Sequence, residues 1–317
     1  MTLPQRYSTV ATSVLVFTLV ASAALAQTAA PQTTPQPAAV QNPLLKEATE
    51  LAGAGKYADA LAQFRKALAA DPALVSAQLG VGRMLDMMGQ YAEARQELAK
   101  AIEMAGPQAK DEARTTMAVS YAFESRAADA AKYYEQVFND RVSAANFNGA
   151  AATANAMARV YLESGDLANA DKWYRTGYET SKKIADLKPP QVDLWQMRWL
   201  NAQARIAARR GNAAEARTHA AAMKALLDKG ENPNEQPQYH YLAGYVSLEG
   251  GDHDTAIAEL SKGNLNDSFV LALLGRAHEK KGDAAKASEY YTKALAATSH
   301  TINTAFAHQS ARKYLQK

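Results

Sequence analysis

The residues best suited to ligand chemistry are two Asn–Arg pairs, Asn155 with Arg159 and Asn201 with Arg205. The members of each pair are four residues apart, so a helix places them on one face. A guanidinium offers a planar fork of N–H donors that fits a carboxylate, and an amide can bond an extended peptide backbone. The two pairs therefore indicate binding of a carboxylate or a peptide rather than catalysis.

Signals for catalysis or for a metal site are poor elsewhere in the sequence. The histidines are His219, His240, His253, His278, His300 and His308. They form no His-x-x-Glu-His or His-x-x-x-His pair, and the chain has no cysteine. Asp252, His253 and Asp254 could be drawn as metal ligands, but they precede a predicted helix, where aspartate serves as a cap. Because a glycine-rich phosphate loop and a Gly-x-Ser-x-Gly elbow are also missing, we expect no catalytic residue, no cofactor and no metal.

The composition favours helices and argues against a nucleic-acid partner. Hydrophobic residues make up 48% of the 317-residue chain, and many are alanine, the strongest helix former. The 35 basic and 32 acidic side chains leave a net charge of +3. This excess is small and scattered, unlike the basic patch of a nucleic-acid-binding protein. We therefore expect an all-α protein that does not bind nucleic acid.

The first 42 residues are predicted to lie outside the fold. Residues 1–26 have the layout of a secretory signal peptide, with Arg6, an uncharged stretch and the small-x-small site Ala24-Leu25-Ala26. The apolar run is shorter than the ~20 residues that span a bilayer, and retention as an anchor stays open. Residues 27–42 are rich in Ala, Pro, Gln and Thr, which is typical of a disordered tether. We expect an exported protein, periplasmic or secreted, without an integral membrane span after signal removal.

The segments that carry the Asn–Arg pairs belong to an internal repeat. A small turn residue, an alanine five positions later and usually a larger side chain four positions after that recur along the chain. The copies are Gly55/Ala60/Phe64, Gly89/Ala94/Leu98, Ser125/Ala130/Tyr134, Gly165/Ala170/Tyr174, Gly211/Ala216/Ala220, Gly251/Ala256/Leu260 and Gly282/Ala287/Tyr291. Glycine permits the turn, alanine permits close approach of a second helix, and the larger side chain fills the space between helices. Each copy thus predicts one helical hairpin.

This pattern resembles the tetratricopeptide repeat family, whose unit of about 34 residues is a pair of antiparallel helices. Ala60 and Ala94 are 34 residues apart, and Gly82 matches the small residue of the first helix. The resemblance covers residues 43–317 and implies an all-α solenoid of about seven hairpins in a right-handed superhelix. A last helix over residues 301–316 is expected to cap the final hairpin.

The middle of the array departs from the 34-residue spacing. A long second helix is predicted over residues 167–188, ended by Pro189 and Pro190, and a further helix over residues 192–210. In the fifth repeat, Ala220 stands where an aromatic residue is usual. We expect altered stacking of the fourth and fifth repeats and the weakest packing near Ala220.

In the family, the first helix of each hairpin lines a concave groove, so the resemblance implies which residues face a partner. These candidates are Arg83, Asn155, Arg159, Arg198, Asn201, Arg205, Tyr241, Tyr245 and Arg276. The alternative is that the arginines pair with Glu112, Glu163 or Glu249 in a solvated groove. Leu45 and Thr49 occupy positions where chaperone-binding relatives carry lysine and asparagine, so a chaperone tail is not the expected ligand.

The sequence leaves three functional hypotheses. The favoured one is an exported scaffold, not an enzyme, that binds a protein or an extended peptide in its concave groove, for envelope assembly or secretion. The second is a module that binds carbohydrate or a cell-wall fragment through Tyr241, Tyr245 and the arginines. The third is an enzyme or enzyme subunit with a site in the irregular middle. If the first holds, Arg159→Ala with Arg205→Ala should weaken partner capture without lowering the melting temperature.

Overall fold

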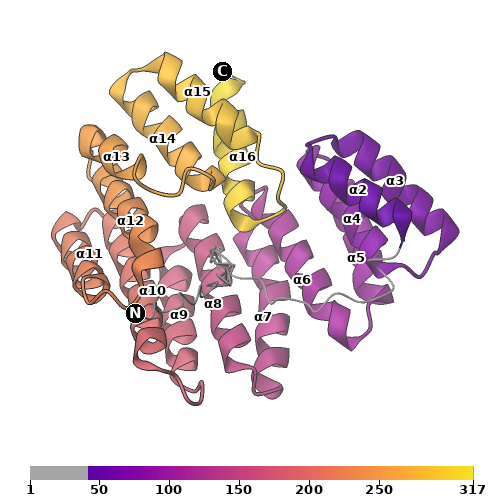
Figure 1. Cartoon of the computed structure of the whole chain (residues 1–317), viewed down its shortest axis with the longest axis horizontal. Helices are drawn as coiled ribbons and strands as arrows, with labels where there is room; N and C mark the ends of the chain where they lie inside the picture. Colours follow the sequence, from indigo (N-terminus) through magenta and orange to yellow (C-terminus); the bar gives the residue numbers. More distant parts are fainter. Residues whose placement is uncertain (1–41, 317) are drawn as a thin grey trace, which may run out of the picture. The chain divides into compact units, whose positions relative to one another are not determined.

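The structure, a computed structural model, describes residues 42–316 (Figure 1). This part of the chain forms seven successive helical hairpins and a last helix, α16 (Ile302–Leu315), and contains no β-strand. The hairpins are α2 (Pro43–Gly53) with α3 (Tyr57–Ala70), α4 (Val75–Met87) with α5 (Tyr91–Met104), α6 (Pro107–Ala122) with α7 (Ala127–Ser143), α8 (Phe147–Ser164) with α9 (Leu167–Ser181), α10 (Pro189–Arg209) with α11 (Ala213–Leu227), α12 (Gln236–Glu249) with α13 (His253–Leu260), and α14 (Ser268–Lys281) with α15 (Ala284–Leu295). A short 3-10 helix, η1 (Pro233–Glu235), precedes α12. The predicted all-α repeat superhelix is therefore confirmed.

The predicted signal peptide (residues 1–26) and tether (residues 27–42) lie outside the described residues, apart from Asn42. Asn42 Oδ1 accepts a hydrogen bond from the N–H of Leu44 at 3.0 Å and so caps the first turn of α2. None of the helices between residues 42 and 316 combines the length and the apolar composition that crossing a membrane requires.

The turn geometry agrees with the predicted repeat register. All seven small turn residues have positive φ, from 54° at Ser125 to 91° at Gly165. Glycine adopts this left-handed conformation without strain, which explains why six of the seven are glycine. The seven alanines five residues later are each 0% exposed. The motif thus marks a buried helix–helix contact in every hairpin.

A glycine on α4 lets its partner helix approach closely. A Cβ on Gly82 would lie 2.5 Å from Leu98 Cδ2 of α5, which is too short for two side chains. Leu98 is 0% exposed, so it has little room to move. The absence of a side chain at Gly82 is therefore a packing requirement of this hairpin.

The boundary between the fourth and fifth hairpins differs from the prediction. Helix α9 ends at Ser181 rather than Lys188, and α10 already begins at Pro189. Pro189 and Pro190 occupy the first turn of α10, where no N–H donor is required, so they start this helix instead of ending the previous one. The N–H of Lys188 donates to Gln191 Oε1 at 2.9 Å and completes the start of α10.

A surface cavity lies beside Ala220, where the repeat lacks its usual aromatic residue. Its volume is about 320 Å³, and small side chains of α11 and α12 line part of it, among them Ala220, Ala221, Ala225 and Ala243. At the equivalent position of the fourth hairpin, the ring of Tyr174 is buried between helices. The missing ring therefore accounts for a hollow between the fifth and sixth hairpins.

Helix α16 packs against two distant parts of the array. It lies on α14 and α15 of the last hairpin, as the predicted capping helix should. It also contacts α6 and α8, the first helices of the third and fourth hairpins (Figure 1). First helices form the concave side of such an array. Helix α16 therefore occupies part of the groove that the sequence predicts to be open.

Polar groups fix the α16 segment to the second hairpin. His300 Nε2 lies 2.8 Å from Asp86 Oδ2, and the two side chains are 5% and 0% exposed. On the next turns of α16, Arg312 donates hydrogen bonds to Tyr91 Oη at 2.5 Å and to Met87 O at 2.9 Å. Buried charged groups are stable only while they are paired, so loss of one partner here is costly.

A buried histidine lies in the same contact. The His308 ring is 2% exposed, with its centroid 6.2 Å from that of Phe123. Burial lowers the pKa of His308 to about 4, and the Arg312 cation adds to this effect. His308 is therefore neutral near pH 7.

Gly82→Ala should lower the free energy of unfolding by about 1–3 kcal/mol, because the added methyl group overlaps Leu98. Leu98→Ala should cost about 2–5 kcal/mol through the cavity that it leaves. In denaturant unfolding, the double variant should lose less than the sum, since the methyl group enters that cavity. Gly53→Ala is the control: nothing lies within 4 Å of its added Cβ, so stability should rise slightly. Strictly additive losses would contradict the contact.

Acidification should weaken the α16 contact through His308. Its pKa is near 6.5 in the unfolded chain and about 4 in the fold, so the unfolded state binds more protons between these values. The contribution is fully present above about pH 6.5 and declines, by about 1–3 kcal/mol, as the pH falls towards 4. In urea unfolding between pH 7 and pH 5, His308→Gln should show a smaller loss than the wild type. His219→Gln, a more exposed histidine, should keep the wild-type slope; an unchanged slope in His308→Gln would refute the assignment.

Candidate functional site

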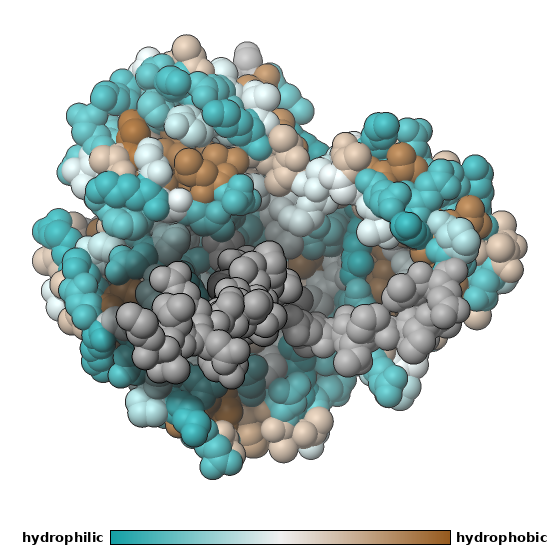
Figure 2. All heavy atoms as spheres, viewed as in Figure 1, coloured by the Kyte–Doolittle hydropathy of each residue, from teal (hydrophilic) through white to brown (hydrophobic). Residues whose placement is uncertain are grey.

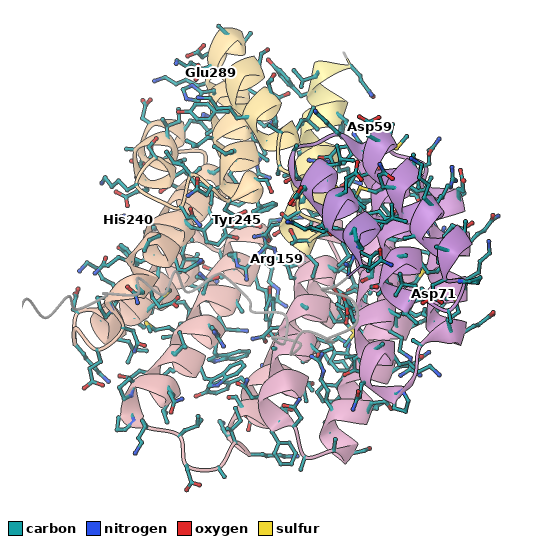
Figure 3. All side chains as sticks on the ribbon, turned by 45° about the vertical axis from the view of Figure 1, so that its right-hand side comes forward. Asp59, Asp71, Arg159, His240, Tyr245 and Glu289 are labelled. Atoms are coloured by element: carbon teal, nitrogen blue, oxygen red, sulfur yellow. The ribbon has the colours of Figure 1, made fainter. Side chains whose placement is uncertain are left out.

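Two helices supply the centre of the candidate site. Arg159 and Glu163 are four residues apart on α8, and Arg205 and Arg209 are four residues apart on α10. This spacing places each pair on one helix face, and the two faces meet. Figure 3 shows Arg159 and Tyr245 in the interior of the array.

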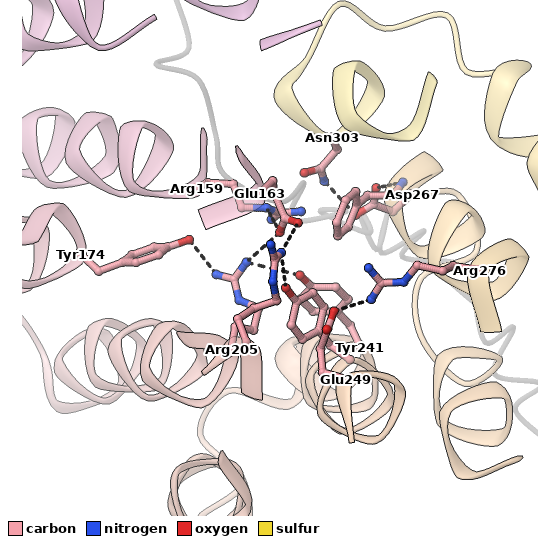
Figure 4. A network of polar contacts seen from close by, with 12 residues as sticks. Arg159, Glu163, Tyr174, Arg205, Tyr241, Glu249, Asp267, Arg276 and Asn303 are labelled. Atoms are coloured by element: carbon pink, nitrogen blue, oxygen red, sulfur yellow. Dashed lines mark hydrogen bonds and ion pairs between the residues drawn. The ribbon is translucent and has the colours of Figure 1, made fainter. Parts of the chain in front are cut away.

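Glu163 is the carboxylate at which the arginines converge (Figure 4). Its side chain is 8% exposed, and Arg159 Nε lies 3.1 Å from its Oε1. Arg209 Nη1 is 3.6 Å from Oε2 of the same carboxylate. Arg205 Nη1 is 4.0 Å from Oε1. Because the interior screens charge less than water does, one carboxylate can hold three guanidiniums here.

Tyrosine hydroxyls complete the shell around Arg205. Its Nη2 donates to Tyr174 Oη at 2.8 Å and its Nη1 to Tyr241 Oη at 3.4 Å. Burial alone would lower the pKa of the Arg205 guanidinium, but Tyr174, Tyr241 and Glu163 outweigh it, so the pKa lies above its usual range. Tyr245, 0% exposed, accepts a hydrogen bond from Arg209 Nη1 at 3.4 Å. The cations therefore stay charged at every physiological pH.

A polar cavity adjoins this cluster. Its volume is about 300 Å³. The residues that line it are Glu163, Arg209, Glu249, Phe269, Ala272, Leu273, Arg276, Phe306, Gln309 and Ser310. They come from α8, α10, α12, α14 and α16, so α16 supplies one wall. Arg276 Nη2 lies 2.5 Å from Glu249 Oε1, and Arg159 lies over the Phe269 ring at 4.3 Å from its centroid.

The cluster carries more positive than negative charge. Its four guanidiniums belong to Arg159, Arg205, Arg209 and Arg276, and its two carboxylates to Glu163 and Glu249. The nearby Asp267 accepts hydrogen bonds from its own helix start, at Phe269 N–H, and from the Asn303 amide. Of these charged groups, Arg209, Arg276, Glu163 and Glu249 line the cavity, so the formal charges of its lining balance.

The other predicted groove residues make different contacts. Arg83 Nη2 pairs with Glu112 Oε1 at 2.7 Å. Arg198 is exposed and lies over the Trp195 ring, 4.6 Å from its centroid. Asn155 packs next to Gly177 of α9, and Asn201 is 8% exposed. The alternative weighed from the sequence named Glu112, Glu163 and Glu249 as partners of the arginines, and they pair with Arg83, Arg159 and Arg276. The Arg159–Glu163 pair is largely buried, however, and not in a solvated groove.

Sequence reasoning missed two parts of the site. From the sequence, we interpret Arg209 as part of a solvated helix end. Its spacing of four from Arg205 could have indicated that the two arginines share a helix face. The sequence does not predict Gln309 and Ser310 as site residues, because nothing in it places α16 in the groove. The structure also changes one expectation: Arg159 and Arg205 are held in the buried cluster, so replacing both by alanine should lower the melting temperature.

The structure gives Asp252 a structural role. Asp252 Oδ1 accepts a hydrogen bond from the N–H of Thr255 at 3.1 Å and caps α13. Asp254 lies 2.5 Å from Lys281 Nζ. Between residues 42 and 316, no group of three or more histidine, aspartate or glutamate side chains is arranged to hold a metal ion.

Glu163→Gln should lower the free energy of unfolding by about 3–5 kcal/mol, because the buried guanidinium of Arg205 and the partly buried guanidiniums of Arg159 and Arg209 lose their shared carboxylate. The matched control is Glu289→Gln, an exposed carboxylate between Lys286 and Lys293, which should change stability little. Chemical denaturation of both variants makes the comparison. Equal effects would show that Glu163 is not the centre of a buried cluster.

Comparisons with known proteins agree with this fold. Two family models described as tetratricopeptide repeat match residues 45–110 and 270–300. A crystal structure of a tetratricopeptide repeat protein from Parabacteroides merdae is similar, with 12% identity and a TM-score of 0.51 over 79% of this chain and 90% of that one. The APC/C hetero-tetramer Cut9–Hcn1 matches at 18% identity and a TM-score of 0.45, over 86% of this chain and 49% of that one. No curated protein matches the chain. The seven helical hairpins and the two repeat matches support a tetratricopeptide repeat protein.

Proposed function

We propose that the protein is an exported scaffold that binds a protein partner at the polar cavity. Tetratricopeptide arrays offer concave surfaces for protein–protein interaction, and the layout of residues 1–26 supports export. Because α16 occupies part of the concave side, the partner does not run along the whole groove. It enters beside α8, α10, α12 and α14. Envelope assembly or secretion is the process that we propose for it.

The observation that carries this proposal is the exposure of two arginines at the cavity. The side chains of Arg209 and Arg276 are 22% and 34% exposed, although both are also paired with glutamate. Their guanidiniums have more N–H donors than these carboxylates use. A partner can therefore bind them through backbone carbonyl or carboxylate oxygens without breaking the cluster.

The rest of the surface supports a polar rather than an apolar contact. Hydrophilic residues predominate on the face shown in Figure 2, outside the grey atoms. The large hydrophobic side chains exposed on the described residues are Met88, Val192, Leu265 and Leu315. They lie on separate segments, whereas an apolar docking face needs a contiguous patch.

The carbohydrate hypothesis receives less support from the geometry. Sugar binding needs aromatic faces that are open to the ligand. Tyr241 and Tyr245 are only 7% and 0% exposed, and their hydroxyls accept hydrogen bonds from Arg205 and Arg209. Their rings are part of the core, so the residues named for this function are not presented to a glycan.

Partner capture should depend on Arg209 and Arg276. With residues 27–317 as bait in native envelope extract, mass spectrometry should find a partner that the Arg209→Ala/Arg276→Ala variant recovers at least tenfold less. Arg65→Ala removes an equally cationic side chain from an exposed pair with Glu93 and should capture as the wild type does. Melting curves check that the double variant is folded. Equal capture by all three proteins would contradict the proposed site.

A further inference from the structure

The Ala220 cavity is the surface cavity of about 320 Å³ between α11 and α12. The boundary one hairpin earlier, between α9 and α10, is filled by contacts that cross it. There Gln203 Nε2 donates a hydrogen bond to Asp171 Oδ1 at 2.9 Å. The buried ring of Tyr174 also crosses that boundary, and its hydroxyl accepts a hydrogen bond from Arg205 Nη2 at 2.8 Å. The earlier boundary thus shows what this position of the array normally contains.

The repeat register identifies what is missing from the Ala220 cavity. Arg217 follows the buried alanine of α11, as Asp171 follows the buried alanine of α9. Ala243 occupies the position on α12 that Gln203 occupies on α10. Ala220 stands where α9 carries its tyrosine. Both the hydrogen bond across the boundary and the ring that fills it are therefore absent here, and the cavity is the space that they leave.

The lining of the Ala220 cavity suits an aromatic ring. It consists largely of alanines from α11 and α12, with Val246 and the half-buried ring of Tyr239. A cavity of about 150 Å³ is enough to hold benzene, and aromatic rings pack favourably against one another. Ala221 and Ala225 are exposed, so the cavity opens to the surface. A phenyl group can therefore enter while it is attached to a chain.

The cavity also carries one cation without a partner. The exposed side chain of Arg217 forms no ion pair and no hydrogen bond with any residue from 42 to 316. The other charged residues of the lining, Lys224 and Asp228, pair with each other at 2.7 Å. An acidic group beside a bound ring can therefore pair with Arg217. Because exposed ion pairs contribute little, the ring should supply most of the affinity.

From the missing ring and the unpaired arginine we infer that the Ala220 cavity docks an aromatic side chain of a partner protein, with an acidic residue beside it that pairs with Arg217. The partner's Phe or Tyr ring takes the place that the Tyr174 ring has one hairpin earlier. Residues 27–41 of this chain contain no aromatic residue, so this segment cannot supply the ring.

This site goes beyond the proposed function, because it uses a different face of α12. Tyr239 and Ala243 are four residues apart and line the Ala220 cavity. Tyr245 and Glu249 are also four residues apart, but they face the arginine cluster and the polar cavity. Figure 1 shows α11 at the outer edge of the array. Docking at α11 therefore does not need the arginines of the polar cavity.

Isothermal titration calorimetry with residues 27–317 tests the inference. The probes are the blocked peptide Gly-Glu-Phe-Glu-Gly, the ring-free Gly-Glu-Ala-Glu-Gly, the uncharged Gly-Gln-Phe-Gln-Gly and free phenylacetate. The first should bind at least about tenfold more tightly than the ring-free peptide and about threefold more tightly than the uncharged one at low salt. Equal binding without the ring, or no binding, would overturn the site. Phenylacetate binding as tightly as the first peptide would assign the cavity to free aromatic acids instead.

Ala220→Tyr should block the cavity with a ring of the chain itself. The new ring can pack as the Tyr174 ring does one hairpin earlier, so the melting temperature should not fall. The affinity for Gly-Glu-Phe-Glu-Gly should fall at least about tenfold, because the phenyl group loses its place. Full affinity in this folded variant would show that the peptide binds elsewhere.

Arg217→Glu provides a second test that leaves the core unchanged. Because Arg217 is exposed and unpaired, the melting temperature should stay the same. The variant should bind Gly-Lys-Phe-Lys-Gly more tightly than Gly-Glu-Phe-Glu-Gly, the reverse of the wild type. Lys66→Glu, an equal change of charge at an exposed position of α3, should keep the wild-type preference. An unreversed preference in Arg217→Glu would contradict the assigned pairing.

Discussion

The contact between the α16 segment and the second hairpin is the constraint on which the structure depends. A hairpin buries its apolar faces only against neighbours, and in an open array the two ends lack one neighbour each. Here the last helix supplies a neighbour to early hairpins as well as to the final one. The Asp86–His300 pair joins residues 214 positions apart, and removal of one side chain would leave the other buried without this partner. Closure therefore connects the last hairpin with the second, third and fourth hairpins.

Closure also explains why Arg205 is buried and Arg159 is largely covered. In a groove open to water, Arg159 and Arg205 would be hydrated, and their charge would be screened within about 10 Å at moderate salt. Enclosed by α12, α14 and α16, they need fixed partners, and Glu163 and the tyrosine hydroxyls provide them. The candidate site is thus a consequence of how the array closes.

The sequence predicted the features that local spacing encodes. Gly55, Ala60 and Phe64 specify a hairpin within ten residues, and the pairing of Arg159 with Glu163 follows from a spacing of four. The position of α16 depends instead on the summed curvature of seven hairpins, which no local pattern records. The start of α10 was misplaced for a different reason, because a proline can end one helix or open the next. Arg209 was missed because a helix's own sequence does not show which neighbour covers its last turn.

A double-mutant cycle between Asp86 and His300 tests the closure most directly. Asp86→Ala, His300→Ala and the double variant are unfolded in urea at pH 7, and the coupling free energy is taken from the four stabilities. If α16 docks on the second hairpin, the buried side chains of Asp86 and His300 should show a coupling free energy of at least about 1 kcal/mol. A coupling near zero, with both single variants folded, would mean that α16 does not close the array.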